Sequence, residues 1–167
     1  MIWLHGGGFN EGMSYGPVNL YDGSNIAAGS GGRGLCVVGV NYRLGVLGFL
    51  VTEKQPGNQG ILDQRAAMVW VRENIASFGG NPDSVTLWGQ SAGAMSVAVH
   101  LVSPGSKGLF HRAIMESNVA AFRYQQAPHQ ARGYGAAFAK QSPCGKLSAL
   151  ACLQQVAHPQ QSGARGR

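Results

Sequence analysis

Short runs of consecutive apolar residues alternate with segments of helical apolar spacing along this chain. The runs predict buried strands at residues 2–4, 35–40, 84–88 and 112–115, because a strand covered on both faces is apolar at every position. Helices are predicted at residues 25–28, 92–102 and 127–140, and over a longer segment that ends at Phe78. Strands that alternate with helices predict an α/β fold with a mostly parallel central sheet flanked by helices.

The helix that ends at Phe78 has the clearest pattern. Its apolar residues recur at steps of three and four, as on one face of an α-helix: Met68, Val71, Ile75 and Phe78. Trp70 is expected on the flank of this face. The two glycines at 79–80 are expected to end the helix, and residues 81–83 (Asn-Pro-Asp) to form the turn into the next strand.

The composition is that of a globular domain with an unusual number of glycines. The 167 residues are 44% apolar and 12% charged, and this length indicates one domain or part of one. The 26 glycines cluster at residues 6–8, 29–34 and 79–80 without a fibrous period, so they indicate turns. Cys36 lies in an apolar run and is expected to be buried.

The net charge of +6 does not indicate a nucleic-acid partner. Lys and Arg are scattered along the chain, whereas a nucleic-acid-binding face gathers them into a stripe. No apolar segment reaches the ~18 residues of a membrane span, and the first residues lack the basic region and cleavage site of a signal peptide. We therefore expect no nucleic-acid partner and no membrane span, while the sequence leaves the oligomeric state open.

The segment GQSAG at residues 89–93 fits the G-x-S-x-G pattern of a nucleophile elbow, in which a serine projects from a sharp turn between a strand and a helix. The predicted strand at 84–88 and helix at 92–102 supply that setting. A side chain at position 89 or 93 is expected to collide with the neighbouring strand or helix, which explains glycine at both. Ser91 is therefore the candidate nucleophile, and the helix directs its free amides and positive dipole end at the reacting centre.

A second glycine motif, HGGG at residues 5–8, follows the first predicted strand. Backbone N–H groups stabilise the tetrahedral oxyanion of ester hydrolysis, each by about 3 kcal/mol, and a loop without side chains brings them close to the substrate. We assign the oxyanion hole to the N–H groups of Gly7, Gly8 and Ala92. This chemistry needs no cofactor, and we find no cluster of metal ligands in the sequence.

Four segments together resemble the type-B carboxylesterase family, the cholinesterase-like α/β-hydrolases: HGGGF at 5–9, NYRLGVLGFL at 41–50, GNQGILDQRAAMVWVRENIASFGGNPDSVTLWGQSAGA at 57–94 and GLFHRAI at 108–114. The resemblance is dense over residues 1–118 and looser over 131–156. It implies an incomplete α/β-hydrolase fold, in which residues 1–157 form a partial domain that lacks N- and C-terminal portions and residues 158–167 form a disordered tail. It also implies serine esterase chemistry on a small-molecule carboxylic ester.

The resemblance also implies roles for single residues. Ser91 matches the family's nucleophile, and Gly7, Gly8 and Ala92 match its oxyanion hole. Four further residues match positions that hold the scaffold together: Asn41, Asn58, Asp63 and Gln64.

Two cysteines near the end of the chain resemble a family disulfide pair, Cys144 and Cys152, although spacing alone leaves their pairing open. A disulfide there implies secretion or the lumen of the endoplasmic reticulum.

Two positions depart from the family pattern. Gln90 replaces the glutamate that cholinesterases carry before the serine, which favours a general carboxylesterase. Asn118 follows Ser117 where the family usually has glycine. Asparagine tolerates left-handed backbone better than most residues, so we expect this turn to be kept.

A serine hydroxyl needs a general base to act as a nucleophile, and in this fold the acid and the histidine follow the serine in the chain. The only acid after Ser91 is Glu116, and the histidines after it are His129 and His158. We do not expect these to form a working triad, and the resemblance places the family's acid and histidine beyond residue 167. The other histidines are expected in the glycine loop, on a helix face and at a strand edge: His5, His100 and His111.

Two alternatives to an active esterase stay open. One is a cholinesterase-like binding or adhesion domain without hydrolytic activity, although such relatives commonly lose the serine or alter the glycine loop, and this chain keeps both. The other is a truncated, non-functional gene product, which fits the start of Met1 directly in a core strand and the lack of a base. Even as an esterase, the chain by itself is expected to be inactive or weakly active.

Overall fold

The computed structural model describes residues 1–29, 31, 34–52, 55–118 and 128–141. Within them, four strands form a sheet in the order β2-β1-β3-β4: β1 (Ile2–Leu4), β2 (Val38–Val40), β3 (Thr86–Gln90) and β4 (Arg112–Glu116). All three strand pairings are parallel. The predicted α/β architecture with a parallel sheet is confirmed, and the carboxyl ends of the strands meet at one edge.

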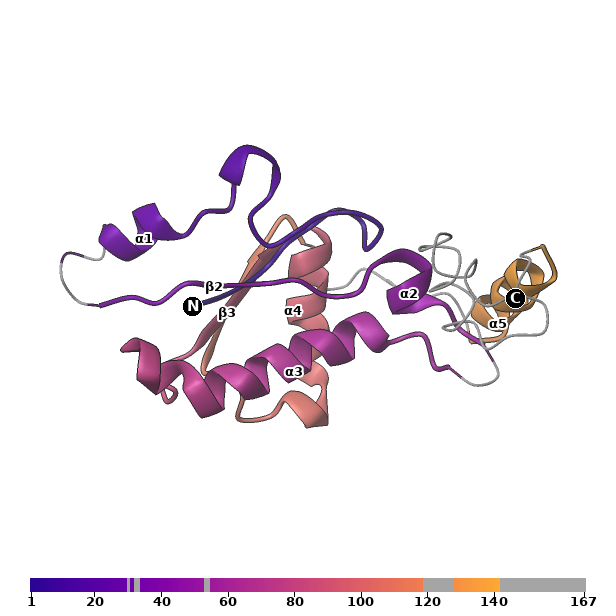
Figure 1. Cartoon of the computed structure of the whole chain (residues 1–167). Coiled ribbons are helices and arrows are strands. Elements are labelled where there is room, and N and C mark those ends of the chain that lie inside the picture. The colour runs from indigo at the N-terminus through magenta and orange to yellow at the C-terminus, as the bar shows by residue number, and fades with distance from the viewer. Residues whose placement is uncertain (30, 32–33, 53–54, 119–127, 142–167) are drawn as a thin grey trace, which may run out of the picture.

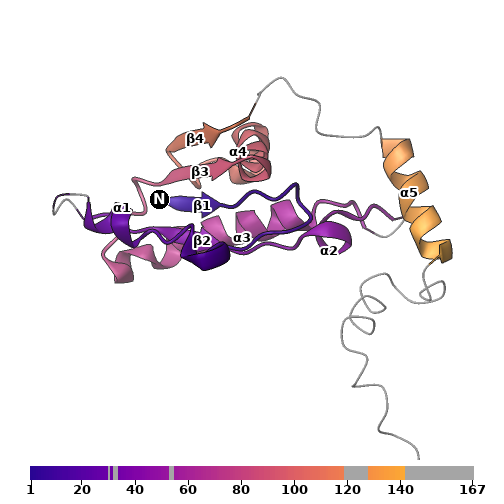
Figure 2. The same cartoon turned by 90° about the horizontal axis from the view of Figure 1, so that it is seen from above.

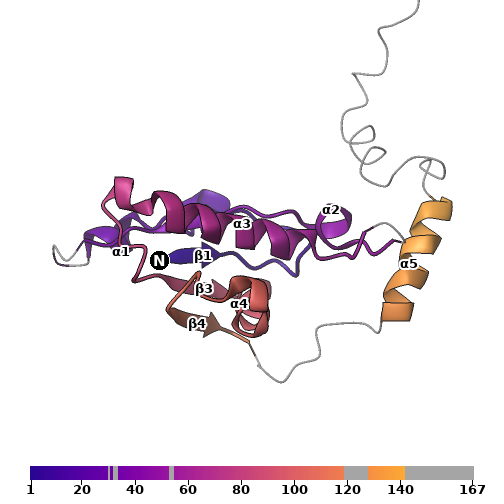
Figure 3. The same ribbon diagram turned by 90° about the horizontal axis from the view of Figure 1, so that it is seen from below.

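The helices are α1 (Ser24–Ala28), α2 (Gly45–Phe49), α3 (Gln59–Asn74), α4 (Ala92–Val102) and α5 (Pro128–Gln141), with the 3₁₀ helices η1 (Pro17–Asn19), η2 (Ile75–Phe78) and η3 (Pro104–Ser106). Helices α3 and α4 lie on one side of the sheet, and the segment with α1 lies on the other (Figure 1). Helix α5 stands away from the sheet, beyond α2, in the views from above and below (Figures 2 and 3). Helix α4 has the predicted bounds.

The core lies between the sheet and helices α3 and α4. It is built from side chains of strands, helices and the segments next to them: Ile2, Leu4, Val40, Met68, Val71, Ile75, Val85, Leu87, Val97 and Leu109. Because side chains alternate across a strand, Trp3 and Trp88 occupy the opposite face. Their rings pack at 4.5 Å, and Tyr21 covers Trp3 at 5.1 Å. The core thus fixes β1, β3 and α4 against one another.

The predicted helix ending at Phe78 is present, but two of its aromatic residues are not on the buried face. Trp70 is 46% exposed and Phe78 is 64% exposed, and their rings contact each other at 5.7 Å. Trp70 follows Met68 by two residues, a spacing that does not share a helix face. Phe78 is the last residue of the 3₁₀ turn η2, directly before Gly79, and its side chain is on the surface where the helix ends. Gly79 ends this turn with a left-handed backbone (φ 78°).

Two strands are less buried than their apolar runs predicted. Strand β2 is limited to Val38–Val40, and Cys36 before it is half-buried, with its thiol donating to the carbonyl of Phe78 at 3.3 Å. In β4, Ile114 is 39% exposed and Met115 37% exposed. Both strands have a single partner among the described residues, and a local apolar run does not reveal whether a strand lies at the centre or at the edge of a sheet.

Several predictions lie outside the described residues. These are the disulfide between Cys144 and Cys152, the tail at 158–167 and the position of His158. They stay predictions.

Candidate active site

Ser91 lies in the turn between β3 and α4, at the carboxyl edge of the sheet. Its backbone angles, φ 54° and ψ −121°, belong to a region that side-chain-bearing residues rarely occupy. The turn is held from both sides, because the N–H of Ser91 donates to the carbonyl of Glu116 at 2.9 Å and its carbonyl accepts the N–H of Met95 at 2.9 Å. The sharp, strained turn expected of a nucleophile elbow is therefore present.

Glycine at positions 89 and 93 is required by close backbone contacts, as predicted. A Cβ on Gly93 would lie 1.9 Å from the carbonyl oxygen of Leu4, and a Cβ on Gly89 would lie 2.5 Å from the carbonyl carbon of Gly93. The elbow is thus pressed between β1 and its own helix. This contact brings the end of β1, and the loop that follows it, next to Ser91.

The glycine loop follows β1 directly and reaches the elbow. A Cβ on Gly6 would lie 3.2 Å from Cβ of Ser91 and 2.8 Å from the carbonyl oxygen of Gln90. Gly7 and Gly8 continue the loop at φ 109° and φ 61° and are exposed. Gly6 was not singled out in the sequence, although it belongs to the HGGG run; it is the residue that packs against Ser91.

The amides assigned to the oxyanion hole come from two different elements. Within the described part of the chain, the N–H groups of Gly7 and Gly8 donate no hydrogen bond. Ala92 is the first residue of α4 and is 1% exposed, and the first amides of a helix have no partner inside it. Unpaired amides and the positive end of the helix dipole favour negative charge beside Ser91.

His5 holds the glycine loop in place through contacts of its ring and its backbone. Its ring is buried and stacks on Tyr42 at 4.5 Å, its Nδ1 lies 2.8 Å from the carbonyl oxygen of Gly6, and the Tyr42 hydroxyl donates to the His5 carbonyl at 2.7 Å. Burial lowers the pKa of His5, against the smaller opposing effect of the Gly6 carbonyl. His5 is thus a structural member of the loop, as expected, and its lowered pKa favours the neutral ring.

The predicted scaffold residues connect the elements around the site. Arg43 forms a bidentate ion pair with Asp63, with both nitrogen–oxygen distances at 2.7 Å, and its backbone N–H donates to the same carboxylate at 3.0 Å. These bonds lower the pKa of Asp63 against the desolvation that raises it. Asn41 accepts the N–H of Ser14 at 2.8 Å. The ion pair between Arg43 and Asp63 connects the segment after β2 to helix α3.

The turn after β4 differs in detail from the prediction. The left-handed residue is Ser117, at φ 57°, and not Asn118. The Asn118 side chain instead donates to the carbonyl of Ala94 in the first turn of α4, at 3.2 Å. Asparagine therefore fixes β4 against the elbow helix by a side-chain bond.

Ser91 has no hydrogen bond to His5, His100 or His111. His100 bonds Ser106 and Gln64 inside the core, and Nδ1 of His111 accepts the N–H of Val85 at 3.1 Å. Glu116 ends β4 with its side chain exposed, and His129 belongs to α5. Among the described residues, the structure brings together the nucleophile and the glycine loop but no acid–histidine pair.

The described residues include no cluster of metal-binding side chains and no helix of the length and apolarity needed to cross a bilayer.

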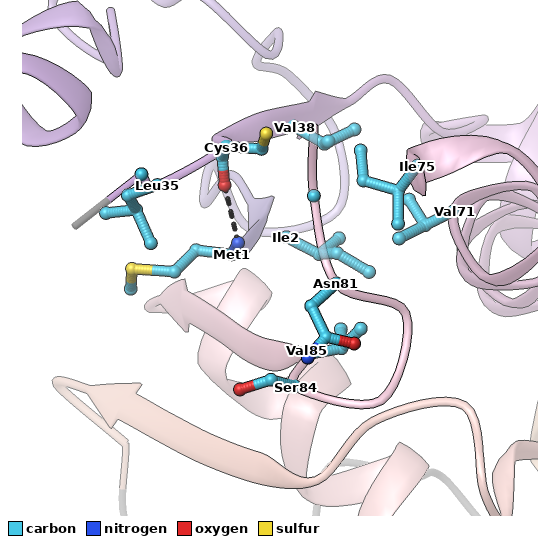
Figure 4. A pocket seen from close by; sticks show the side chains of 12 residues that line it. Met1, Ile2, Leu35, Cys36, Val38, Val71, Ile75, Asn81, Ser84 and Val85 are labelled. Atoms are coloured by element: carbon cyan, nitrogen blue, oxygen red, sulfur yellow. Dashed lines mark hydrogen bonds between the residues drawn. The ribbon is translucent and has the colours of Figure 1, made fainter. Parts of the chain in front are cut away.

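A hollow of about 140 Å³ lies at the opposite edge of the sheet, where the strands begin (Figure 4). Met1, Cys36, Val71, Ile75 and Val85 are among the residues that line it, and the amino group of Met1 donates to the carbonyl of Cys36 at 2.6 Å. Because parallel strands place Ser91 at the other edge, this hollow does not belong to the candidate site.

The chain belongs to the carboxylesterase family, whose sequence profile matches residues 1–161. It is 54% identical over 122 residues to pyrethroid hydrolase Ces2e of Rattus norvegicus, with 72% of this chain and 20% of that protein covered. It is 41% identical over 168 residues to acetylcholinesterase 4 of Caenorhabditis briggsae, with 97% and 27% covered.

Solved esterase structures share the fold. The carboxylesterase Est55 of Geobacillus stearothermophilus superposes with a TM-score of 0.77 at 36% identity, over 95% of this chain and 36% of that one. A thermophilic pNB esterase gives 0.74 at 38% identity, over 95% and 35%. The fold is therefore that of the α/β-hydrolase esterases, and the chain spans between 20% and 36% of the length of these four relatives.

Proposed function

We propose that this chain supplies the nucleophile and the oxyanion hole of a carboxylic ester hydrolase that works through an acyl-enzyme. The observation that supports this proposal is the meeting of two turns that are distant in sequence: Gly6 of the glycine loop packs against Ser91 of the elbow. Membership of the carboxylesterase family supports the same class of reaction. An ester is the substrate class that this arrangement suits.

In the proposed reaction, Oγ of Ser91 attacks the carbonyl carbon of the ester, and the carbonyl oxygen becomes an oxyanion. The N–H groups of Gly7, Gly8 and Ala92 hold this charge, each contributing about 3 kcal/mol. Collapse of the intermediate expels the alcohol and leaves the acyl group on Ser91. Water then attacks the acyl carbon, releases the acid and restores the hydroxyl.

The base that takes the proton of Ser91 is proposed to be a residue other than His5, His100 and His111. The ring of each of these is held by bonds inside the scaffold, and the first two are buried at 1% and 2% exposure. A base must reach the hydroxyl within about 3 Å. The exposed side chain of Glu116 has no histidine partner among the described residues.

A small-molecule carboxylic ester is the proposed substrate. Three relatives are named as a pyrethroid hydrolase, a cocaine esterase and an acylcarnitine hydrolase, and each is 54–55% identical over 122 residues. An acetylcholinesterase and two cholinesterases are 41–45% identical over longer spans. Together with Gln90 before the serine, this supports a general carboxylesterase. No metal or cofactor takes part in the proposed steps.

The test is covalent labelling of the full protein with a fluorophosphonate, which reacts with activated serines. We expect one adduct on the peptide that contains Ser91, none in Ser91→Ala, and wild-type labelling in Ser77→Ala, an exposed serine used as control. A folded protein that hydrolyses no ester and takes no label at Ser91 contradicts the proposal and favours a non-catalytic binding domain.

A further inference from the structure

A row of buried polar side chains runs from the interior of the core to the first residue of the elbow helix. It consists of four residues, each no more than 2% exposed: Ser106, His100, Gln64 and Ser96. Ser106 Oγ lies 2.8 Å from His100 Nδ1, and His100 Nε2 lies 3.0 Å from Gln64 Oε1. Gln64 Nε2 donates to Ser96 Oγ at 3.0 Å, and Ser96 Oγ donates to the carbonyl of Ala92 at 3.0 Å.

The end of the row at Ala92 fixes the direction of every bond in it. The Ala92 carbonyl is only an acceptor, so the Ser96 hydroxyl donates its single hydrogen there and accepts a hydrogen bond from the Gln64 amide nitrogen. The amide oxygen of Gln64 then accepts from Nε2–H of His100, and in the neutral ring the other nitrogen accepts from the hydroxyl of Ser106. Each donor therefore points toward Ala92, an arrangement in which successive bonds strengthen one another.

The residues of the row are also connected to the sheet. Gln64 follows Asp63, which the bidentate pair with Arg43 holds to the end of β2. His100 and Ser96 belong to α4, and Ser106 to η3 after it. The row thus connects β2, α3, η3 and the first turn of α4, a turn whose leading amides have no partner within the helix.

We infer that Ser96, held by the Gln64 amide, positions the Ala92 N–H toward the reacting carbonyl. A serine that bonds back to the carbonyl four residues earlier usually disturbs a helix slightly, so this bond is not explained by helix stability alone. Here it fixes the residue whose amide borders Ser91. Ser96 and Gln64 are positioning residues, since neither is bonded to Ser91, whereas Ser106 bonds only His100 at the far end of the row. This inference rests on the proposed function.

The test compares two matched substitutions in the full protein, Ser96→Ala and Ser106→Ala. Each removes the hydroxyl of a serine that is at most 1% exposed, and the two serines lie at opposite ends of the row. A purely structural role therefore lowers the unfolding midpoint and the activity similarly in both variants. The inference instead predicts that kcat for an aryl ester falls about tenfold in Ser96→Ala with KM unchanged, because an oxyanion-hole donor is worth about 100-fold or more when it is lost completely. In Ser106→Ala kcat is expected to change less than twofold.

A trifluoromethyl ketone, which forms a tetrahedral adduct on the serine, provides the second measurement. Its inhibition constant is expected to rise with the fall in kcat in Ser96→Ala and to stay at the wild-type value in Ser106→Ala. Should Ser96→Ala fail to fold, Ser96→Cys fills nearly the same space with a weak donor. This variant is also expected to have a lower kcat than the wild-type protein.

Equal kcat values for the two alanine variants, or wild-type kcat in a folded Ser96 variant, overturn the inference and leave the proposed function intact. A wild-type protein that takes no label at Ser91 overturns both.

Discussion

The contact between the elbow and β1 leads to a sharp prediction for Gly93→Ala. The added methyl carbon would lie 1.9 Å from the carbonyl oxygen of Leu4, 2.7 Å from its carbonyl carbon and 2.9 Å from the carbonyl oxygen of His5. All three are backbone atoms, so no side chain is able to rotate away. Helix α4 and strand β1 must move apart instead.

The size of this movement follows from the contact distances. A carbon–oxygen contact is ordinary from about 3.4 Å, so the backbones must separate by about 1.5 Å. Overpacking of this kind costs about 1–3 kcal/mol of the free energy of unfolding. The same movement carries the glycine loop away from Ser91, and a misplacement of about 1 Å at a reacting centre costs about 100-fold in rate.

The assay is the rate of fluorophosphonate labelling, measured beside the urea unfolding midpoint of the same sample. We expect Gly93→Ala to label about 100-fold more slowly or not at all. Gly133→Ala is the control, because Gly133 lies exposed in α5 with no atom within 4 Å of an added Cβ, and alanine there is expected to add up to about 1 kcal/mol of stability with unchanged labelling. Wild-type labelling and an unchanged midpoint in Gly93→Ala refute the proposed packing of elbow and loop.

Three further outcomes are expected. Tyr42→Phe removes the 2.7 Å bond to the buried carbonyl of His5 and is expected to lower the free energy of unfolding by about 1–3 kcal/mol; an unchanged urea midpoint contradicts this. Burial, with a lesser contribution from Arg65, lowers the pKa of His100 from 6.5 to about 4, so between these values the unfolded state binds more protons than the folded state. The stability present above pH 6.5 is therefore lost as the pH falls toward 4, by roughly 3 kcal/mol; urea unfolding at pH 4 and 7 checks this, and His100→Gln is expected to lose that part of the pH dependence. Ser91→Gly relieves a backbone strain of about 1–3 kcal/mol, so it is expected to melt at a higher temperature than Ser91→Ala, although both abolish labelling; equal melting temperatures count against a strained elbow.

Local sequence determined the elements and the two glycine motifs of this protein. A helix such as α4, with small residues after a strand and Pro-Gly after its end, depends on neighbours in the chain, and its bounds were predicted from them. The need for glycine at 89 and 93 also followed from the geometry of any strand–serine–helix turn. These features depend on short-range sterics and hydrogen bonding, which a sequence pattern records directly.

Tertiary structure decided which of the local patterns meet and which are covered. The burial of β4 and Phe78 was predicted wrongly, because an apolar residue is buried only if another element packs on it. The contact of Gly6 with Ser91 and the row from Ser106 to Ala92 join residues that are 85 and 14 positions apart. The first contact arises where parallel strands align their carboxyl ends, and the row arises where Gln64 of α3 meets α4. Both are long-range events that leave no periodic signal in the chain.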